Sequence, residues 1–143
     1  DGSKTNGKWN INPINQTEVD EKTYTGTWSN TIAAGVYSGM MASSLPARPY
    51  DRVATAVATA YGNVTGTVDL CLQFAGDDRA LARWSTGDKQ NATVTNSGII
   101  PANTAPGIGV GVRGGSQGGK ATLPSDRQLN RLVVTAFPIA MAV

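Results

Sequence analysis

The segment from Val53 to Tyr61 alternates strictly, and one side of it carries alanine alone. Alternation with a period of two is typical of a β-strand, because successive side chains point to opposite faces of a sheet. A strand with only small side chains on one face lets another layer approach that face closely. We therefore predict a packing face formed by Ala54, Ala56, Ala58 and Ala60.

The alternation resumes after a glycine-bounded stretch at residues 62–66, which reads Gly-Asn-Val-Thr-Gly. Beyond it, the large apolar residues Val68, Leu70, Leu72 and Phe74 alternate with Thr67, Asp69, Cys71 and Gln73. A short stretch with Gly and Asn between two alternating runs is the usual signal of a turn. We therefore expect one long β-hairpin over residues 52–74, with its tip at 62–66.

The rest of the chain also favours strands, and no stretch has a convincing helical period. Strands are expected at residues 23–28, 34–43, 80–84, 91–100, 107–112 and 129–141. About eight strands at regular intervals are typical of an antiparallel β-sandwich or jelly-roll. Residues 1–22 are polar and are expected to form an extended arm, and residues 23–143 a single β-sandwich domain.

The chain has 143 residues, a formal net charge of +2 and only 15% charged residues. Its basic residues are scattered, so nothing favours a nucleic-acid partner. The longest apolar stretch, residues 132–143, is interrupted by Thr135 and Pro138 and is shorter than the roughly 20 residues of a membrane helix. We expect no membrane insertion. The start at Asp1, without methionine or an apolar leader, suggests a piece of a longer protein.

Residue types that commonly carry out catalysis are scarce. The chain has no histidine and one cysteine, Cys71, so a thiol nucleophile has no imidazole base and no internal disulfide can form. Residues 109–114 match GxGxxG and residues 114–120 match GxxxxGK, but neither opens a helix that would hold a phosphate. We therefore predict no enzyme, no cofactor and no metal.

A second row of small residues lies in the glycine-rich segment, where Gly107, Gly109 and Gly111 alternate with Ile108, Val110 and Val112. Together with the alanine row, it predicts a packing or oligomer face. We expect a homo-oligomer, with a trimer favoured.

A sugar-binding site usually needs an exposed aromatic ring with polar groups beside it. The best candidate is Trp84, at the end of a predicted strand between two turns, and the alternative is that Trp84 belongs to the core at this strand end. The residues predicted to bind a ligand are Trp84, Arg83, Asp77, Asp78, Arg79 and Asn91.

Two functions fit these features. The first is a surface-recognition module that binds a cell-surface glycan or protein receptor, like the tip domain of a phage tail fibre or a pilus-type adhesin. The alternative is a structural assembly subunit of a capsid, a decoration protein or a fimbria. Either function implies an extracellular or virion-surface location.

Overall fold

The computed structural model describes residues 4–5, 8–9, 17–24, 26–74, 78–123 and 130–139. All regular structure in these ranges is β, and no helix there is long and apolar enough to cross a membrane. The strands are β1 (Lys4–Thr5), β2 (Lys8–Trp9), β3 (Glu18–Thr23), β4 (Trp28–Ile32), β5 (Tyr37–Ala42), β6 (Arg52–Phe74), β7 (Asp78–Trp84), β8 (Gly87–Ile100), β9 (Gly109–Leu123) and β10 (Arg131–Pro138).

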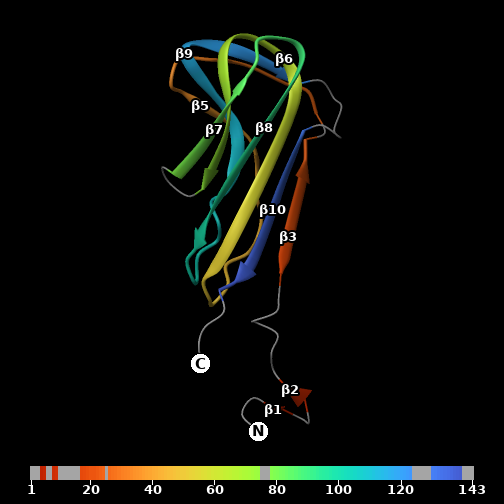
Figure 1. Cartoon of the computed structure of the whole chain (residues 1–143), viewed down its shortest axis with the longest axis vertical. Helices are drawn as coiled ribbons and strands as arrows, with labels where there is room; N and C mark the ends of the chain where they lie inside the picture. Colours follow the sequence, from red (N-terminus) through yellow and green to blue (C-terminus); the bar gives the residue numbers. More distant parts are fainter. Residues whose placement is uncertain are drawn as a thin grey trace.

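Strands β3 to β10 form one antiparallel sheet of eight strands, and β1 and β2 pair separately. The sheet curls around its central strand, β6 (Figure 1). The first half of β6 lies between β10 and β8, and its second half lies between β9 and β7. Strand β3 extends the first half beyond β10, while β4 and β5 both pair with β9 in the second half. The predicted fold class, an antiparallel β-sandwich of jelly-roll type, is confirmed.

The predicted hairpin over residues 52–74 is wrong, because β6 is a single strand of 23 residues. Its two halves pair with different neighbours rather than with each other. The residues expected at the hairpin tip instead form a bend with register shifts at Gly62/Val64 and Gly66/Val68. Bulges of this kind increase the local twist and turn a strand without ending it.

The glycines of this bend are needed for two different reasons. A Cβ atom on Gly62 would lie 2.3 Å from the carbonyl oxygen of Thr122, so only glycine allows β9 to pass this close. Gly66 has a φ of +74°, a left-handed conformation that favours glycine. The side chain of Asn63 accepts a hydrogen bond of 2.9 Å from the backbone N–H of Lys89, which holds the bend against the start of β8.

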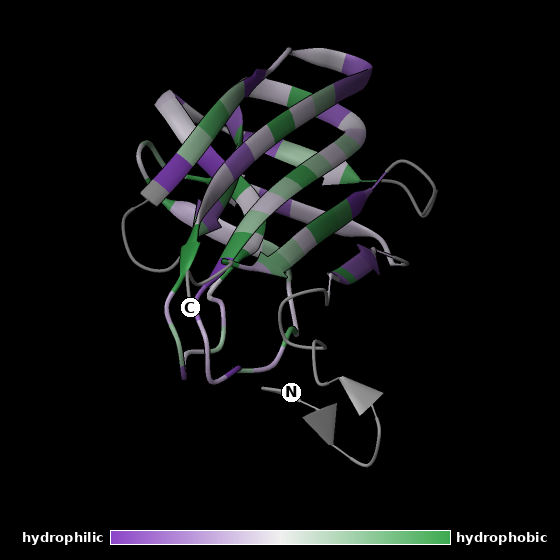
Figure 2. Ribbon diagram, turned by 60° about the horizontal axis from the view of Figure 1, so that its bottom comes forward, coloured by the Kyte–Doolittle hydropathy of each residue, from purple (hydrophilic) through white to green (hydrophobic). Residues whose placement is uncertain are grey.

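The core fills the inside of the curled sheet, and hydrophobic and hydrophilic residues alternate along several of its strands (Figure 2). The alanine row lies on the inner side, where its four residues are at most 2% exposed. In the second half of β6, the inner side carries the larger Val68, Leu70 and Leu72, all fully buried. The alanine row is therefore a packing face within one copy of the chain, and a second copy cannot reach it.

Other boundaries differ from the expectations. β3 pairs with β10 along its whole length, so the predicted arm of residues 1–22 cannot extend as far as residue 22. β9 continues through the GxxxxGK stretch at residues 114–120, which is strand. Residues 114–120 form strand because their backbone pairs with β4 and β6, whereas a glycine-rich sequence by itself predicts strand only weakly.

Enlarging the alanine row should destabilise the fold. We expect Ala56→Leu or Ala58→Leu to lower the free energy of unfolding by about 1 to 3 kcal/mol, because a fully packed face cannot take the added volume. Urea unfolding followed by tryptophan fluorescence measures the change. The outward substitution Thr55→Val is the control and should change stability by less than about 0.5 kcal/mol. Equal effects of Ala56→Leu and the control would show that the row is not tightly packed.

Candidate functional site

Trp84, the centre of the predicted ligand site, lies in the core. Its side chain is fully buried, and its indole N–H donates a hydrogen bond of 2.9 Å to the carbonyl oxygen of Gln90. The ring is therefore unavailable for stacking on a sugar. Strand alternation decides this, since Trp84 shares the inner side of β7 with Ala80 and Ala82.

Of the other predicted ligand-binding residues, the described arginines and Asn91 lie on different halves of the sheet. Arg79 and Arg83 lie on the outer side of β7, opposite Gln73 and Asp69 of β6. Asn91 lies on β8, opposite Tyr61 in the first half of the sheet. The side chain of Asp78 and all of Asp77 lie outside the described residues.

A charged hollow of about 440 Å³ opens on the outer side of the second half of the sheet. Asp69 of β6 lies between two arginines, with Arg83 beside it on β7 and Arg113 beside it on β9. The Arg83 Nε donates a hydrogen bond of 2.9 Å to Asp69 Oδ1, and the aspartate side chain is only 12% exposed. The hollow is lined by Ala34, Gly35, Asp69, Arg83, Arg113, Gly114, Gly115 and Ser116.

Backbone forms the wall opposite Asp69. The connection between β4 and β5 crosses β9, where the N–H of Gly35 donates to the carbonyl oxygen of Gly114 at 2.9 Å. A Cβ atom on Gly114 would lie 2.0 Å from the carbonyl oxygen of Ala33, so a side chain there would push this wall away. The ligand-binding residues predicted from the sequence include Arg83 but not Arg113 or Asp69, because strand pairing alone brings these three together.

The predicted glycine face is filled by a side chain of the same chain. A Cβ atom on Gly111 would lie 2.8 Å from the ring of Tyr37, so the ring occupies the space that the glycine leaves. A Cβ atom on Gly109 would lie 3.2 Å from the carbonyl oxygen of Met41 and 3.8 Å from the Tyr37 hydroxyl, whereas Gly107 is exposed in the loop before β9. Cys71 is fully buried beside this region. Burial raises the pKa of both the Cys71 thiol and the Tyr37 phenol, so both stay neutral near pH 7.

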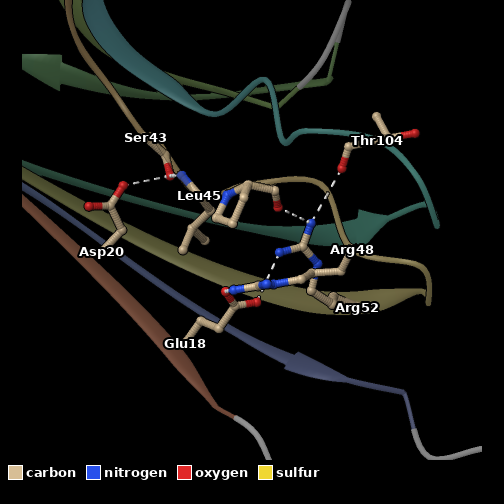
Figure 3. Close-up of polar contacts among 8 residues, drawn as sticks. Glu18, Asp20, Ser43, Leu45, Arg48, Arg52 and Thr104 are labelled. Atoms are coloured by element: carbon tan, nitrogen blue, oxygen red, sulfur yellow. Dashed lines mark hydrogen bonds and ion pairs between the residues drawn. The ribbon is translucent and has the colours of Figure 1, made fainter. Parts of the chain in front are cut away.

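A second charged cluster joins β3 to the start of β6 (Figure 3). Glu18 accepts hydrogen bonds from Arg48 Nη2 at 2.8 Å and from Arg52 Nη1 at 3.0 Å. The Arg52 side chain is fully buried and also donates to the carbonyl oxygens of Pro46 and Thr104. These contacts tie an edge strand and two loops to β6, so the cluster acts as a structural clamp.

The clamp holds two carboxylates in their ionised form. Hydrogen bonding from Arg48, and to a smaller degree from Arg52, lowers the pKa of Glu18 against the opposing effect of burial. Burial alone would raise the pKa of Asp20, but hydrogen bonds from the Ser44 N–H and the Ser43 hydroxyl outweigh it and lower that pKa. Among the described residues, no group of three His, Cys, Asp or Glu side chains could hold a metal ion.

Apolar side chains cluster on the outer side of the first half of the sheet, in rows separated by the row of Thr135, Thr55 and Ser97. Strand pairing places Phe137, Val53 and Ile99 in one row and Val133 beside Val57 in another. Val19 of β3 lies opposite Thr135 of β10 on the same side. We call this set the apolar face: Val19, Val53, Val57, Ile99, Val133 and Phe137. Four of its members are exposed by 37% to 62%.

No protein-family model and no curated protein sequence matches this chain. Solved structures with a similar strand arrangement include the Eiger TNF of S. frugiperda, with a TM-score of 0.44 and 6% identity over 89% of this chain and 95% of the other. The structure of infectious bursal disease virus (Gx strain) has a TM-score of 0.40 and 11% identity, and the match covers 90% of this chain and 38% of the viral chain. The globular domain of zebrafish complement 1qA has a TM-score of 0.37 and 8% identity, and the match covers 88% of this chain and 98% of the other. Similarity this weak identifies no relative.

Removing the charge of Glu18 should unfold the clamp. We expect Glu18→Gln to lower the free energy of unfolding by about 3 kcal/mol, because it leaves the buried Arg52 charge without its partner. Glu21→Gln is the matched control on the same strand. It breaks the ion pair with Arg131, which is 42% exposed, and should cost at most about 1 kcal/mol. Urea unfolding of both variants checks this, and equal losses would contradict the clamp.

Acid should weaken the fold through Glu18 and Asp20. Because both pKa values are lowered in the folded chain, the stabilisation is complete above the ordinary values of 4.5 and 3.8 and is lost as the pH falls below them. We expect the urea midpoint to fall over this range, and to fall less in Glu18→Gln. The same acid dependence in the variant and in the unchanged chain would exclude Glu18 as a source.

Proposed function

We propose that this chain is a non-enzymatic β-domain that works through surface contact, and that it pairs with a second copy of itself through the apolar face. The observation that carries the proposal is the clustering of exposed apolar side chains. Of the six large hydrophobic residues that are exposed in the described chain, Val19, Val57, Ile99 and Phe137 share this one face. Contiguous exposed apolar patches mark interaction surfaces, whereas scattered ones do not.

The charge of the face favours a second copy as its occupant. Two charged side chains lie on this side of β3, β10, β6 and β8, over the rows from Val19 to Thr23. They are Glu21 and Arg131. They form an ion pair with each other, so the face carries no net charge. A neutral face meets its own copy without like-charge repulsion, and the ion pair supplies the polar rim usual at interfaces.

A single self-complementary face also bears on the number of copies. A patch that contacts the same patch on a partner gives a two-fold pair, while a trimer needs two different complementary patches on each copy. The remaining exposed large hydrophobics, Val36 and Leu81, lie on the β4–β5 connection and on β7, away from the apolar face. The trimer favoured by the sequence stays a prediction, and the apolar face supports a pair.

The absence of enzymatic activity is part of this proposal. The thiol of Cys71 is buried with a raised pKa, and the carboxylates of Glu18 and Asp69 are engaged by arginines. Groups held in this way do not act readily as nucleophiles or proton carriers. An extracellular or virion-surface location, expected from the sequence, also belongs to the proposal.

Recognition of a receptor is the second candidate function, and the charged hollow favours it. Arg83 and Asp69 lie there with Arg113, on a part of the outer surface separate from the apolar face. A module can assemble through one surface and bind a ligand through another.

Charge placed in the apolar face should weaken self-association. We expect the unchanged chain to form a pair whose population rises with concentration in sedimentation velocity. Ile99→Lys and Phe137→Glu should each raise the dissociation constant by at least about tenfold, because a charge in the centre of an interface is left desolvated and unpaired.

Val36→Lys is the control, since Val36 is 51% exposed but lies outside the apolar face. It should leave the dissociation constant unchanged. A chain that stays monomeric at every concentration, or a control that weakens association as much as Ile99→Lys, would contradict pairing through the apolar face.

A further inference from the structure

We propose that the hollow between Asp69, Arg83 and Arg113 binds the carboxylate of an acidic sugar residue. The proposal does not depend on self-association, because the hollow and the apolar face lie on different halves of the sheet. It is built from residues of three neighbouring strands and the β4–β5 connection.

The two arginines of the hollow differ in what they already bind. Arg83 uses its Nε for Asp69, and its terminal nitrogens make no hydrogen bond within the described chain. Arg113 makes no hydrogen bond or ion pair among the described residues. Its Nη2 lies 3.8 Å from the position that a Cβ of Gly35 would take, so the guanidinium reaches toward the backbone wall of the hollow. Both arginines therefore keep donors for a ligand.

Charge balance selects a single negative charge. Asp69 and Arg83 neutralise one another across 2.9 Å, so the charge of Arg113 remains uncompensated in the hollow. A carboxylate supplies one negative charge and matches the planar fork of a guanidinium with two parallel hydrogen bonds. A phosphate dianion would bring a second charge close to the nearly buried Asp69, which disfavours it.

The remaining groups suit a sugar ring. Asp69 Oδ2 accepts no hydrogen bond within the described chain and can accept one from a hydroxyl group, and Ser116 is among the residues that line the hollow. The glycine wall leaves a hollow of about 440 Å³. Small-molecule sites commonly measure about 300 to 1,000 Å³, so a monosaccharide fits this space. An acidic sugar provides both the carboxylate and the neighbouring hydroxyl groups.

Saturation-transfer NMR and titration calorimetry on the whole chain test the proposal. The probes are methyl glucuronide and the methyl glycoside of N-acetylneuraminic acid, compared with neutral methyl glucoside and with glucose 6-phosphate. We expect at least one carboxylated sugar to bind, with the neutral sugar and the phosphate each weaker by about tenfold or more. Tighter binding of glucose 6-phosphate than of either acid would overturn the choice of a carboxylate.

Variants of the arginines locate the site. Arg113→Gln should abolish binding, and Arg113→Lys should weaken it, because lysine keeps the charge but loses the fork. Arg79→Gln is the matched control, since Arg79 lies on the outer side of β7 but does not line the hollow. It should leave the affinity unchanged. If Arg113→Gln does not fold, Arg113→Lys decides the question, and the same affinity in Arg113→Lys as in the unchanged chain would overturn the proposal. Failure of every acidic sugar to bind at millimolar concentration would also overturn it.

Discussion

The fold depends on one strand that serves two different sets of neighbours. β6 pairs with β10 and β8 along its first half and with β9 and β7 along its second. The bend at Gly62 and Gly66 makes this change of partners compatible with a continuous strand, because bulges there turn the backbone. Small side chains on the inner side before the bend and large ones after it let the curled sheet close over a filled core.

The start of this strand is held by charge rather than by apolar packing. Arg52 is fully buried, and its guanidinium is satisfied by Glu18 and by two backbone carbonyl oxygens, apart from its Nε, which has no partner among the described residues. Burying a charge is costly unless it is paired, so the clamp constrains where β3 and the two loops lie. It thereby fixes the edge of the half-sheet on which the apolar face is displayed.

The outer surface is divided between two kinds of chemistry. The first half of the sheet displays a neutral, apolar face, and the second half displays the arginines around Asp69. Self-association is favoured where the exposed side chains are mostly apolar and the charges of Glu21 and Arg131 already neutralise each other, and an anion is favoured where a guanidinium has no partner among the described residues. Both surfaces are formed by outward residues of the same strand, β6, so the alternation of one segment contributes to both.

The sequence by itself determined the class of the fold, because a period of two and frequent turn residues leave few alternatives to an antiparallel β-structure. It also placed the alanine row on a contact face and listed Arg83 among the candidate ligand-binding residues. It could not tell a hairpin from a bent strand at residues 62–66, since glycine and asparagine suit both and only the neighbouring strands choose between them. It left Trp84 open between an exposed ring and a core residue, and the inner side of β7 buries it. The meeting of Asp69, Arg83 and Arg113 was decided by tertiary structure alone, because strand register sets which distant residues become neighbours.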